Sequence, residues 1–141
     1  MYKILLTTHG NMCTGMLDTI KLIIPSVENV TVIPFYTEEP GSEPEKELDA
    51  WLAGIGEEDV ALVATDILWG SVNQKIHLKA SGRSNIHVVT GVNLPLMLEL
   101  IALDEDSFRE NENVVSDTVT ESRDYIVYMR EYKIESNDMD E

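Results

Sequence analysis

Three residues with chemically active side chains lie close behind apolar runs of the sequence. His9 directly follows the run at 2–8, and Asp66 closes the run at 59–66. Ser71 comes shortly after Asp66 and directly follows a glycine. An imidazole, a carboxylate and a hydroxyl are the groups that proteins use for nucleophilic catalysis and for carrying phosphoryl groups. These three side chains are therefore the first candidates for a functional site.

Two kinds of site fit these residues only in part. A serine hydrolase would use Ser71, His9 and Asp66, but Ser71 does not lie in the G-x-S-x-G turn that exposes a nucleophile. A metal site would use His9, Cys13 and Asp66, but it needs a further well-spaced ligand, and the other two histidines belong to other elements. Both possibilities remain open at this point.

Phosphoryl transfer on a histidine uses all of these groups. One ring nitrogen of His9 would attack phosphorus, while Asp66 would hold the N–H of the other. Backbone N–H groups at a glycine-rich turn and a helix start bind phosphoryl oxygens, so Gly10, Gly70 and Ser71 are the predicted cradle. A structural role, in which Asp66 and Ser71 merely cap a loop and a helix, is the alternative that residue types alone leave open.

The elements that would position these residues alternate along the chain. Apolar, β-branched runs begin roughly 30 residues apart, which is the length of one βα unit. The predicted strands are 2–8, 30–36, 59–66 and 86–91, with a fifth at 125–129. The predicted helices are 14–24, 44–55, 71–80, 94–103 and 108–123. The pattern predicts an α/β fold with an open, mostly parallel sheet and helices on both faces.

A flavodoxin-like strand order, 2-1-3-4, is the arrangement that this rhythm favours. It places the first and third strands side by side and makes the point between them the place where ligands gather. His9 and Asp66 end these two strands, so the topology predicts that they meet at one edge of the sheet.

The composition excludes several classes of protein. The chain has 141 residues, which suits one domain, predicted over 1–135, with a polar, disordered tail at 136–141. It carries 26 acidic and 10 basic residues and a net charge of −16, which argues against nucleic-acid binding and anionic membranes. The single cysteine and the lack of a long apolar run indicate a cytoplasmic protein.

The acidic residues are concentrated in two segments. Residues 38–60 carry nine acids and one base, and residues 104–141 carry thirteen acids and four bases. The segments that hold the candidate site are close to neutral. The acid excess therefore solvates the surface or attracts a basic protein partner.

Three segments of the chain read ILLTTHGNMCTGMLDTI at 4–20, ALVATDILWGSVNQ at 61–74 and IHVVTGVNLPLMLEL at 86–100. They resemble the enzyme IIA component of the mannose-type (mannose/fructose/sorbose) sugar phosphotransferase system. The resemblance implies a phosphocarrier that accepts a phosphoryl group from phospho-HPr on His9 and donates it to enzyme IIB. In such a protein Asp66 orients the imidazole and Ser71 contacts the phosphoryl group.

The same resemblance implies a homodimer that needs no cofactor and no metal, with a C-terminal antiparallel strand, within about 122–130, exchanged between subunits. The substrate taken up would be a sugar or sugar acid of the mannose, fructose, sorbose or gluconate class. Two alternatives are the phosphocarrier subunit of a dihydroxyacetone kinase system and a non-catalytic regulatory domain that binds a partner.

The chain also departs from the family pattern. Trp69 stands where a glycine is usual, and Ile67 stands where a threonine is common. Because tryptophan tolerates a positive φ poorly, a left-handed backbone is not expected at Trp69. Trp69 is predicted to cover the site or face a partner, and Asn93 and Pro95 to shape the site or a dimer contact.

Overall fold

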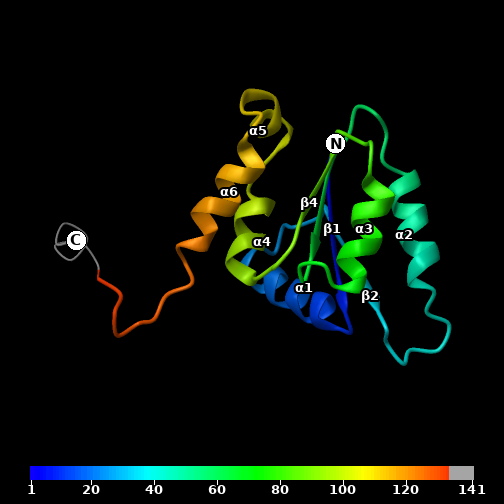
Figure 1. Ribbon diagram of the computed structural model, residues 1–141, viewed down its shortest axis with the longest axis horizontal. Helices are drawn as coiled ribbons and strands as arrows, with labels where there is room; N and C mark the ends of the chain where they lie inside the picture. Colours follow the sequence, from blue (N-terminus) through cyan, green and yellow to red (C-terminus); the bar gives the residue numbers. More distant parts are fainter. Residues whose placement is uncertain (134–141) are drawn as a thin grey trace.

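The computed structural model describes residues 1–133 and shows a parallel sheet flanked by helices (Figure 1). Its strands are β1 (Tyr2–His9), β2 (Val30–Phe35), β3 (Val60–Thr65) and β4 (Ile86–Val89). Its helices are α1 (Met12–Ile23), α2 (Pro44–Ala53), α3 (Ser71–Ala80), α4 (Leu94–Ile101), α5 (Glu105–Glu110) and α6 (Val114–Arg123). The strand order is β2-β1-β3-β4 with parallel pairing throughout, so the predicted fold class and order are confirmed.

The two central strands are covered on both faces. Ile4, Leu5 and Leu6 of β1 are fully buried, and so are four successive residues of β3, from Ala61 to Ala64. Strands covered on both faces are apolar at nearly every position, because neither set of alternating side chains meets water. This is why β1 and β3 could be recognised as continuous apolar runs.

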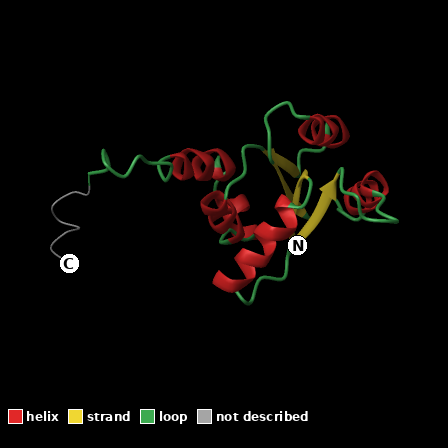
Figure 2. Cartoon of the chain, turned by 90° about the horizontal axis from the view of Figure 1, so that it is seen from below, coloured by secondary structure: helices red, strands yellow, loops and turns green. Residues whose placement is uncertain are grey.

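The helices form one layer on each face of the sheet (Figures 1 and 2). Helices α1, α4 and α6 pack with Ile4 and Leu6 of β1. Helices α2 and α3 pack with Leu5, on the opposite face of the same strand. The carboxyl ends of the strands lie at the lower end of the sheet in Figure 1, where α1 and α3 begin.

The prediction of one helix over 108–123 is wrong, because two helices, α5 and α6, span that region. Asp104 and Ser107 form a capping box that begins α5 before the predicted start. Asn111 then takes an extended backbone, and its side chain accepts the N–H of Asn113 at 2.9 Å. Asparagine side chains that bond to nearby backbone groups compete with helical hydrogen bonds, which breaks the helix at this point.

The segment 125–129 does not form a strand within the described chain. It leaves α6 through turns in which Tyr125 and Ile126 donate their N–H groups to Ser122 and Arg123. All five side chains of this segment are exposed. A strand at 125–129 would need a neighbouring strand to pair with, and the predicted partner belongs to a second subunit. The exchanged strand therefore stays a prediction. The predicted tail at 136–141 and the domain boundary at 135 lie outside the described residues.

Candidate functional site

His9 and Asp66 meet because their strands are parallel neighbours. Thr7 of β1 pairs with Thr65 of β3, so the residues that follow both strands emerge together at the carboxyl edge. Beyond His9 the chain turns at Gly10, which has a φ of +58° and donates its N–H to the carbonyl of Phe35 at 2.7 Å. That bond means that the Gly10 N–H is already engaged and is not free for a phosphoryl oxygen in this arrangement.

One oxygen of Asp66 holds both the backbone and the ring of His9. Oδ2 accepts the His9 backbone N–H at 2.9 Å and lies 2.9 Å from the ring Nδ1. Oδ1 accepts the N–H of Ile67 at 3.0 Å. Burial works to raise the pKa of Asp66, but the hydrogen bonds from His9 outweigh it and lower the pKa. An ionised carboxylate only accepts, so in the neutral imidazole Nδ1 carries the proton and Nε2 has the lone pair.

Nε2 of His9 faces the start of α3. The Ser71 hydroxyl lies within hydrogen-bond distance of Nε2, at 3.2 Å. Ser71 is the first residue of α3, and no side chain within residues 1–133 caps that turn. The first N–H groups of a helix have no partner inside the helix and attract anions. Nε2 therefore looks toward donors suited to phosphoryl oxygens.

Gly70 allows the loop before α3 to pass close to the imidazole. A Cβ at this position would lie 3.2 Å from atoms of Ile67 and 3.5 Å from Cε1 of His9. Any side chain here would push the loop or the ring away. The sequence-predicted residues Gly70 and Ser71 therefore both lie beside His9.

Tyr36 is a member of the site that sequence reasoning missed. It directly follows β2, and its ring centroid lies 5.3 Å from that of His9, tilted by 37°. Its hydroxyl donates to Ser71 Oγ at 3.0 Å. The available signal was topological, since β2 neighbours β1 and the residue that ends β2 must reach the edge where His9 lies.

The expectation that Trp69 avoids a left-handed backbone is wrong, because its φ is +59°. Its N–H donates to the Asn73 side chain at 3.1 Å, and its carbonyl accepts from the Gln74 side chain at 2.6 Å. Its ring meets His77 edge-on, with centroids 5.5 Å apart. These contacts with α3 offset the backbone strain. The Trp69 ring lies against His77 on α3 and not over His9.

Asn93 and Pro95 lie at the same end of the sheet, where Asn93 precedes α4 and Pro95 is in its first turn. The Asn93 side chain accepts the N–H of Leu96 at 2.9 Å, which makes it the cap of that helix. The preceding residue, Val92, donates its N–H to the carbonyl of Thr65 at 3.1 Å and ties this loop to the end of β3. Pro95 is exposed on the helix surface.

The residues weighed for a metal site do not gather around one point. Cys13 lies in the first turn of α1 and is fully buried in the core. Among the residues that the structure describes, no group of three histidine, cysteine, aspartate or glutamate side chains is arranged to hold an ion. The hydrolase set does come together, since Ser71, His9 and Asp66 form a chain of hydrogen bonds.

Large apolar side chains are exposed on the segments that carry the site. They are Met12, Tyr36, Ile67, Leu68 and Trp69, and we call them the apolar rim. Exposed apolar groups that gather around a polar centre are typical of surfaces that bind another protein. Within residues 1–133, no helix has the length and apolar character needed to cross a membrane.

The chain is similar to known components of sugar phosphotransferase systems. The family model described as "PTS system fructose IIA component" matches residues 3–116. A structure of the system component EIIA from Streptococcus agalactiae has 26% identity and a TM-score of 0.73, covering 92% of this chain and 98% of that one. A candidate phosphoenolpyruvate-dependent sugar phosphotransferase system permease from Klebsiella pneumoniae has 26% identity and a TM-score of 0.78, covering 92% of each chain.

The mannose/sorbose-specific IIA subunit from Enterococcus faecalis shares the fold, with 18% identity, a TM-score of 0.75 and coverage of 94% of this chain and 97% of that one. No curated protein sequence matches the chain significantly. The family match extends over well more than half of the chain and includes both His9 and Asp66, so the protein belongs to the mannose/fructose-type IIA family of the sugar phosphotransferase system.

Proposed function

We propose that the protein is a phosphocarrier that receives a phosphoryl group from phospho-HPr on Nε2 of His9 and passes it to a cognate enzyme IIB. The proposed transport substrate is a sugar or sugar acid of the mannose, fructose, sorbose or gluconate class. One observation carries the assignment: Asp66 holds Nδ1–H at 2.9 Å, which leaves the lone pair of Nε2 toward the start of α3.

The transfer is an in-line displacement. The Nε2 lone pair forms a bond to phosphorus, while the bond between phosphorus and the donor's leaving atom breaks and its electron pair stays with the donor. Nδ1 keeps its proton, so positive charge develops on the His9 ring as the new bond forms. The Asp66 carboxylate stabilises that charge at the atom beside it. In the second transfer the acceptor's nucleophile forms a bond to phosphorus, the bond between phosphorus and Nε2 breaks, and its electron pair returns to Nε2.

The phosphoryl oxygens would be held by the Ser71 hydroxyl and the free N–H groups of the first turn of α3. The Ser71 hydroxyl lies 3.2 Å from Nε2, so a phosphoryl group bound to that nitrogen would take its place beside the ring. An oxygen of the phosphoryl group could then accept a hydrogen bond from the same hydroxyl. The partial positive charge of a helix N-terminus adds modest stabilisation. A carrier needs such moderate binding, because the group must leave again.

The apolar rim is the proposed docking surface for both partner proteins. Ile67, Leu68 and Trp69 are each more than half exposed, although they directly follow the catalytic aspartate. A partner that covers them would remove water from His9 during transfer. The acidic segment that begins just after Tyr36 would attract a basic surface around that contact.

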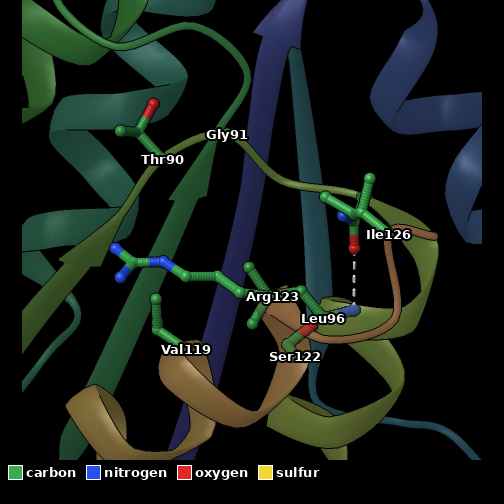
Figure 3. A pocket seen from close by; sticks show the side chains of 8 residues that line it. Thr90, Gly91, Leu96, Val119, Ser122, Arg123 and Ile126 are labelled. Carbon is green, nitrogen blue, oxygen red and sulfur yellow. Dashed lines mark hydrogen bonds between the residues drawn. The ribbon is translucent and has the colours of Figure 1, made fainter. Parts of the chain in front are cut away.

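A homodimer is proposed, formed by antiparallel pairing of segment 125–129 with β4 of a second copy. Within residues 1–133, β4 pairs only with β3, so its other edge is free. A cavity of about 130 Å³ lies between the end of β4 and α6, lined by Thr90, Ser122 and Ile126 among others (Figure 3). The buried Thr90 and Ser122 hydroxyls have no hydrogen-bond partner in the described chain. Buried polar groups are normally paired, so this edge has the character of a surface that another chain completes.

Phosphorylation by purified components tests the proposed function. The protein is incubated with phosphoenolpyruvate, enzyme I and HPr, and its intact mass is measured. We expect a gain of one phosphoryl group that is absent in His9→Ala and present in His77→Ala, which removes an exposed histidine of α3. Failure of the wild-type protein to gain mass while HPr is phosphorylated would overturn the proposal.

Acceptor identity separates this function from the dihydroxyacetone kinase alternative. The phosphorylated protein is mixed with enzyme IIB or with a dihydroxyacetone kinase and its bound nucleotide. Transfer to IIB supports the proposed pathway, and transfer only to the nucleotide supports the alternative. A non-catalytic partner-binding domain would instead keep its cellular function in His9→Ala.

Ester hydrolysis is a second candidate, because the Ser71–His9–Asp66 chain has the order of groups found in serine hydrolases. A hydrolase would lose turnover of p-nitrophenyl acetate in Ser71→Ala as completely as in His9→Ala. A carrier would keep phosphorylation of His9 in Ser71→Ala, because Ser71 only helps to hold the group.

A further inference from the structure

Four side chains, Tyr36, Ser71, His9 and Asp66, form a single line of hydrogen bonds that passes through the His9 ring. We propose that Tyr36 is a further positioning residue of this line: its hydroxyl directs the Ser71 proton to Nε2 in the unphosphorylated protein and turns to a phosphoryl oxygen once Nε2 is occupied. The proposal rests on the proposed phosphocarrier function and adds to it a residue outside the predicted site.

The direction of each hydrogen bond follows from the ionised carboxylate. Asp66 only accepts, so Nδ1 of His9 donates, and in the neutral imidazole Nε2 can only accept. The Ser71 hydroxyl, 3.2 Å away, must then donate its single proton to Nε2. The Tyr36 hydroxyl donates to Ser71 Oγ at 3.0 Å. The two hydroxyl donors, of Tyr36 and Ser71, therefore point toward Nε2, while Nδ1–H points away from it to Asp66.

The backbone of Tyr36 is strained in a way that favours this position. Its φ is +60°, a left-handed conformation that is unfavourable for a residue other than glycine. Phe35 is fixed on one side by its buried ring and by the N–H of Gly10. The reversal at Tyr36 places its ring beside the His9 ring, where an extended residue would continue away from the site. Strain of this kind is characteristic of functional positions.

Occupation of Nε2 removes the acceptor of the Ser71 hydroxyl. The Ser71 proton then has no lone pair to meet on the ring, while the phosphoryl group brings three acceptor oxygens to the same place. Ser71 and Tyr36 can each keep one hydrogen bond by turning to these oxygens. The number of hydrogen bonds is conserved, so the phosphoryl group is held without being trapped.

Tyr36→Phe tests this role because it removes the hydroxyl and keeps the ring and the backbone. Tyr132→Phe is the matched control, since Tyr132 is exposed beyond α6. Each protein is labelled with ¹⁵N-histidine, and part of it is phosphorylated with potassium phosphoramidate, which needs no partner protein. The ¹⁵N resonance of Nε2 is measured before phosphorylation, and the ³¹P resonance of phosphohistidine is measured after phosphorylation.

We expect both resonances to move in Tyr36→Phe and to stay unchanged in Tyr132→Phe. We also expect the phosphoryl exchange equilibrium with HPr to shift about fivefold toward phospho-HPr in Tyr36→Phe, as the loss of a half-exposed hydrogen bond to a charged group implies. Unchanged resonances in Tyr36→Phe would overturn the role of Tyr36 while leaving the carrier function intact. A wild-type protein that phosphoramidate labels and phospho-HPr does not would overturn the proposed donor, and the two resonances would still decide the role of Tyr36. If neither donor labels His9, both proposals fail.

Discussion

Oδ2 of Asp66 lies 2.9 Å from both the backbone nitrogen and the ring Nδ1 of His9. A single acceptor atom thus fixes the position of the residue and the orientation of its ring. Two bonds to one oxygen leave the imidazole little freedom to rotate, and the protonated nitrogen is set at the same time. The proposed choice of Nε2 as the reacting atom rests on this geometry and not on the histidine itself.

Replacing Asp66 by asparagine should separate these effects from packing. The amide is similar in size but lacks the charge that stabilises the ring during transfer, so we expect phosphorylation of His9 to slow about 100-fold or more. Rapid-quench measurement of transfer from phospho-HPr gives the rate. Asp49→Asn, which changes an exposed aspartate of α2, is the control. Similar rates in the two variants would contradict the role of Asp66.

Trp69 offers a direct measurement of backbone strain. Glycine adopts a positive φ freely and alanine does not, so Trp69→Gly should be more stable than Trp69→Ala by about 1 kcal/mol. Both variants lose the contact with His77, which therefore cancels in the comparison. Urea unfolding followed by circular dichroism gives the two free energies.

The neighbouring Leu68 supplies the control for this comparison. It is similarly exposed but does not have a positive φ. Alanine should therefore be more stable than glycine at Leu68, which is the reverse of the order at Trp69. The same order at both positions would show that no strain is relieved.

The meeting of His9 and Asp66 was predictable because it depends only on strand order. Buried parallel strands can be recognised in the sequence as continuous apolar runs, and the residues that follow them lie together at the carboxyl end of the sheet. The family motifs supplied the chemistry for that edge. The start of α3 at Ser71 was also predictable, since a glycine precedes a polar residue at the head of an amphipathic segment.

Tyr36 and Trp69 could not be predicted in their observed conformations. A positive φ at an aromatic residue runs against local preference and is maintained by contacts with α3, which lies far from Tyr36 in the sequence. The division between α5 and α6 was different in kind, because Asp104 and Ser107 gave a local signal that the broad helical pattern obscured. Segment 125–129 shows a third limit, since the proposed strand pairs with a second chain and would not form in one chain alone.

Exposure of segment 125–129 leads to a prediction about assembly. Ile126 is 76% exposed, and in the proposed dimer it would lie against β4 of the other copy. Ile126→Asp should therefore weaken the dimer at least tenfold in sedimentation equilibrium. Leu22→Asp is the control, because Leu22 is 84% exposed on α1, away from β4. A wild-type protein that sediments as a monomer, or equal weakening in both variants, would contradict the dimer.

Asp59 should make stability depend on acid pH. Its carboxylate accepts the N–H of Gly56 at 2.9 Å and lies 3.5 Å from Lys3, and together with the N-terminal ammonium group these contacts lower its pKa to about 2. The folded pKa is below the usual value of about 3.9, so the carboxylate form favours the fold. Its contribution is complete above about pH 4 and is lost as the pH falls toward 2.

Asp59→Asn should therefore lower Tm by the same amount at pH 7 and pH 5. The difference from the wild type should narrow as the pH is taken from 4 toward 2, because the wild-type carboxyl becomes protonated there. Differential scanning calorimetry gives Tm at each pH, and Asp18→Asn, at an exposed position of α1, is the control. A difference that stays constant down to pH 2 would show that the contacts of Asp59 do not depend on its charge.

Two pairs of exposed glutamates lie at opposite ends of the strands, and comparing them tests electrostatic steering of a partner. Glu38 and Glu39 are exposed just after β2, at the edge that carries His9, whereas Glu57 and Glu58 are exposed just before β3, at the other edge. If acidic groups near the site draw in a basic partner, the double replacement of Glu38 and Glu39 by glutamine should slow transfer at low salt. The same replacement of Glu57 and Glu58 removes equal charge and should have a smaller effect, because screening over about 10 Å weakens distant charges.

In the wild type the bimolecular transfer rate should fall about tenfold between roughly 0.02 and 0.5 M salt. Stopped-flow kinetics with phospho-HPr measure all three. Equal effects of the two double variants would show that the net charge matters and the position of the glutamates does not. A transfer rate that does not change with salt would show that these glutamates only solvate the surface.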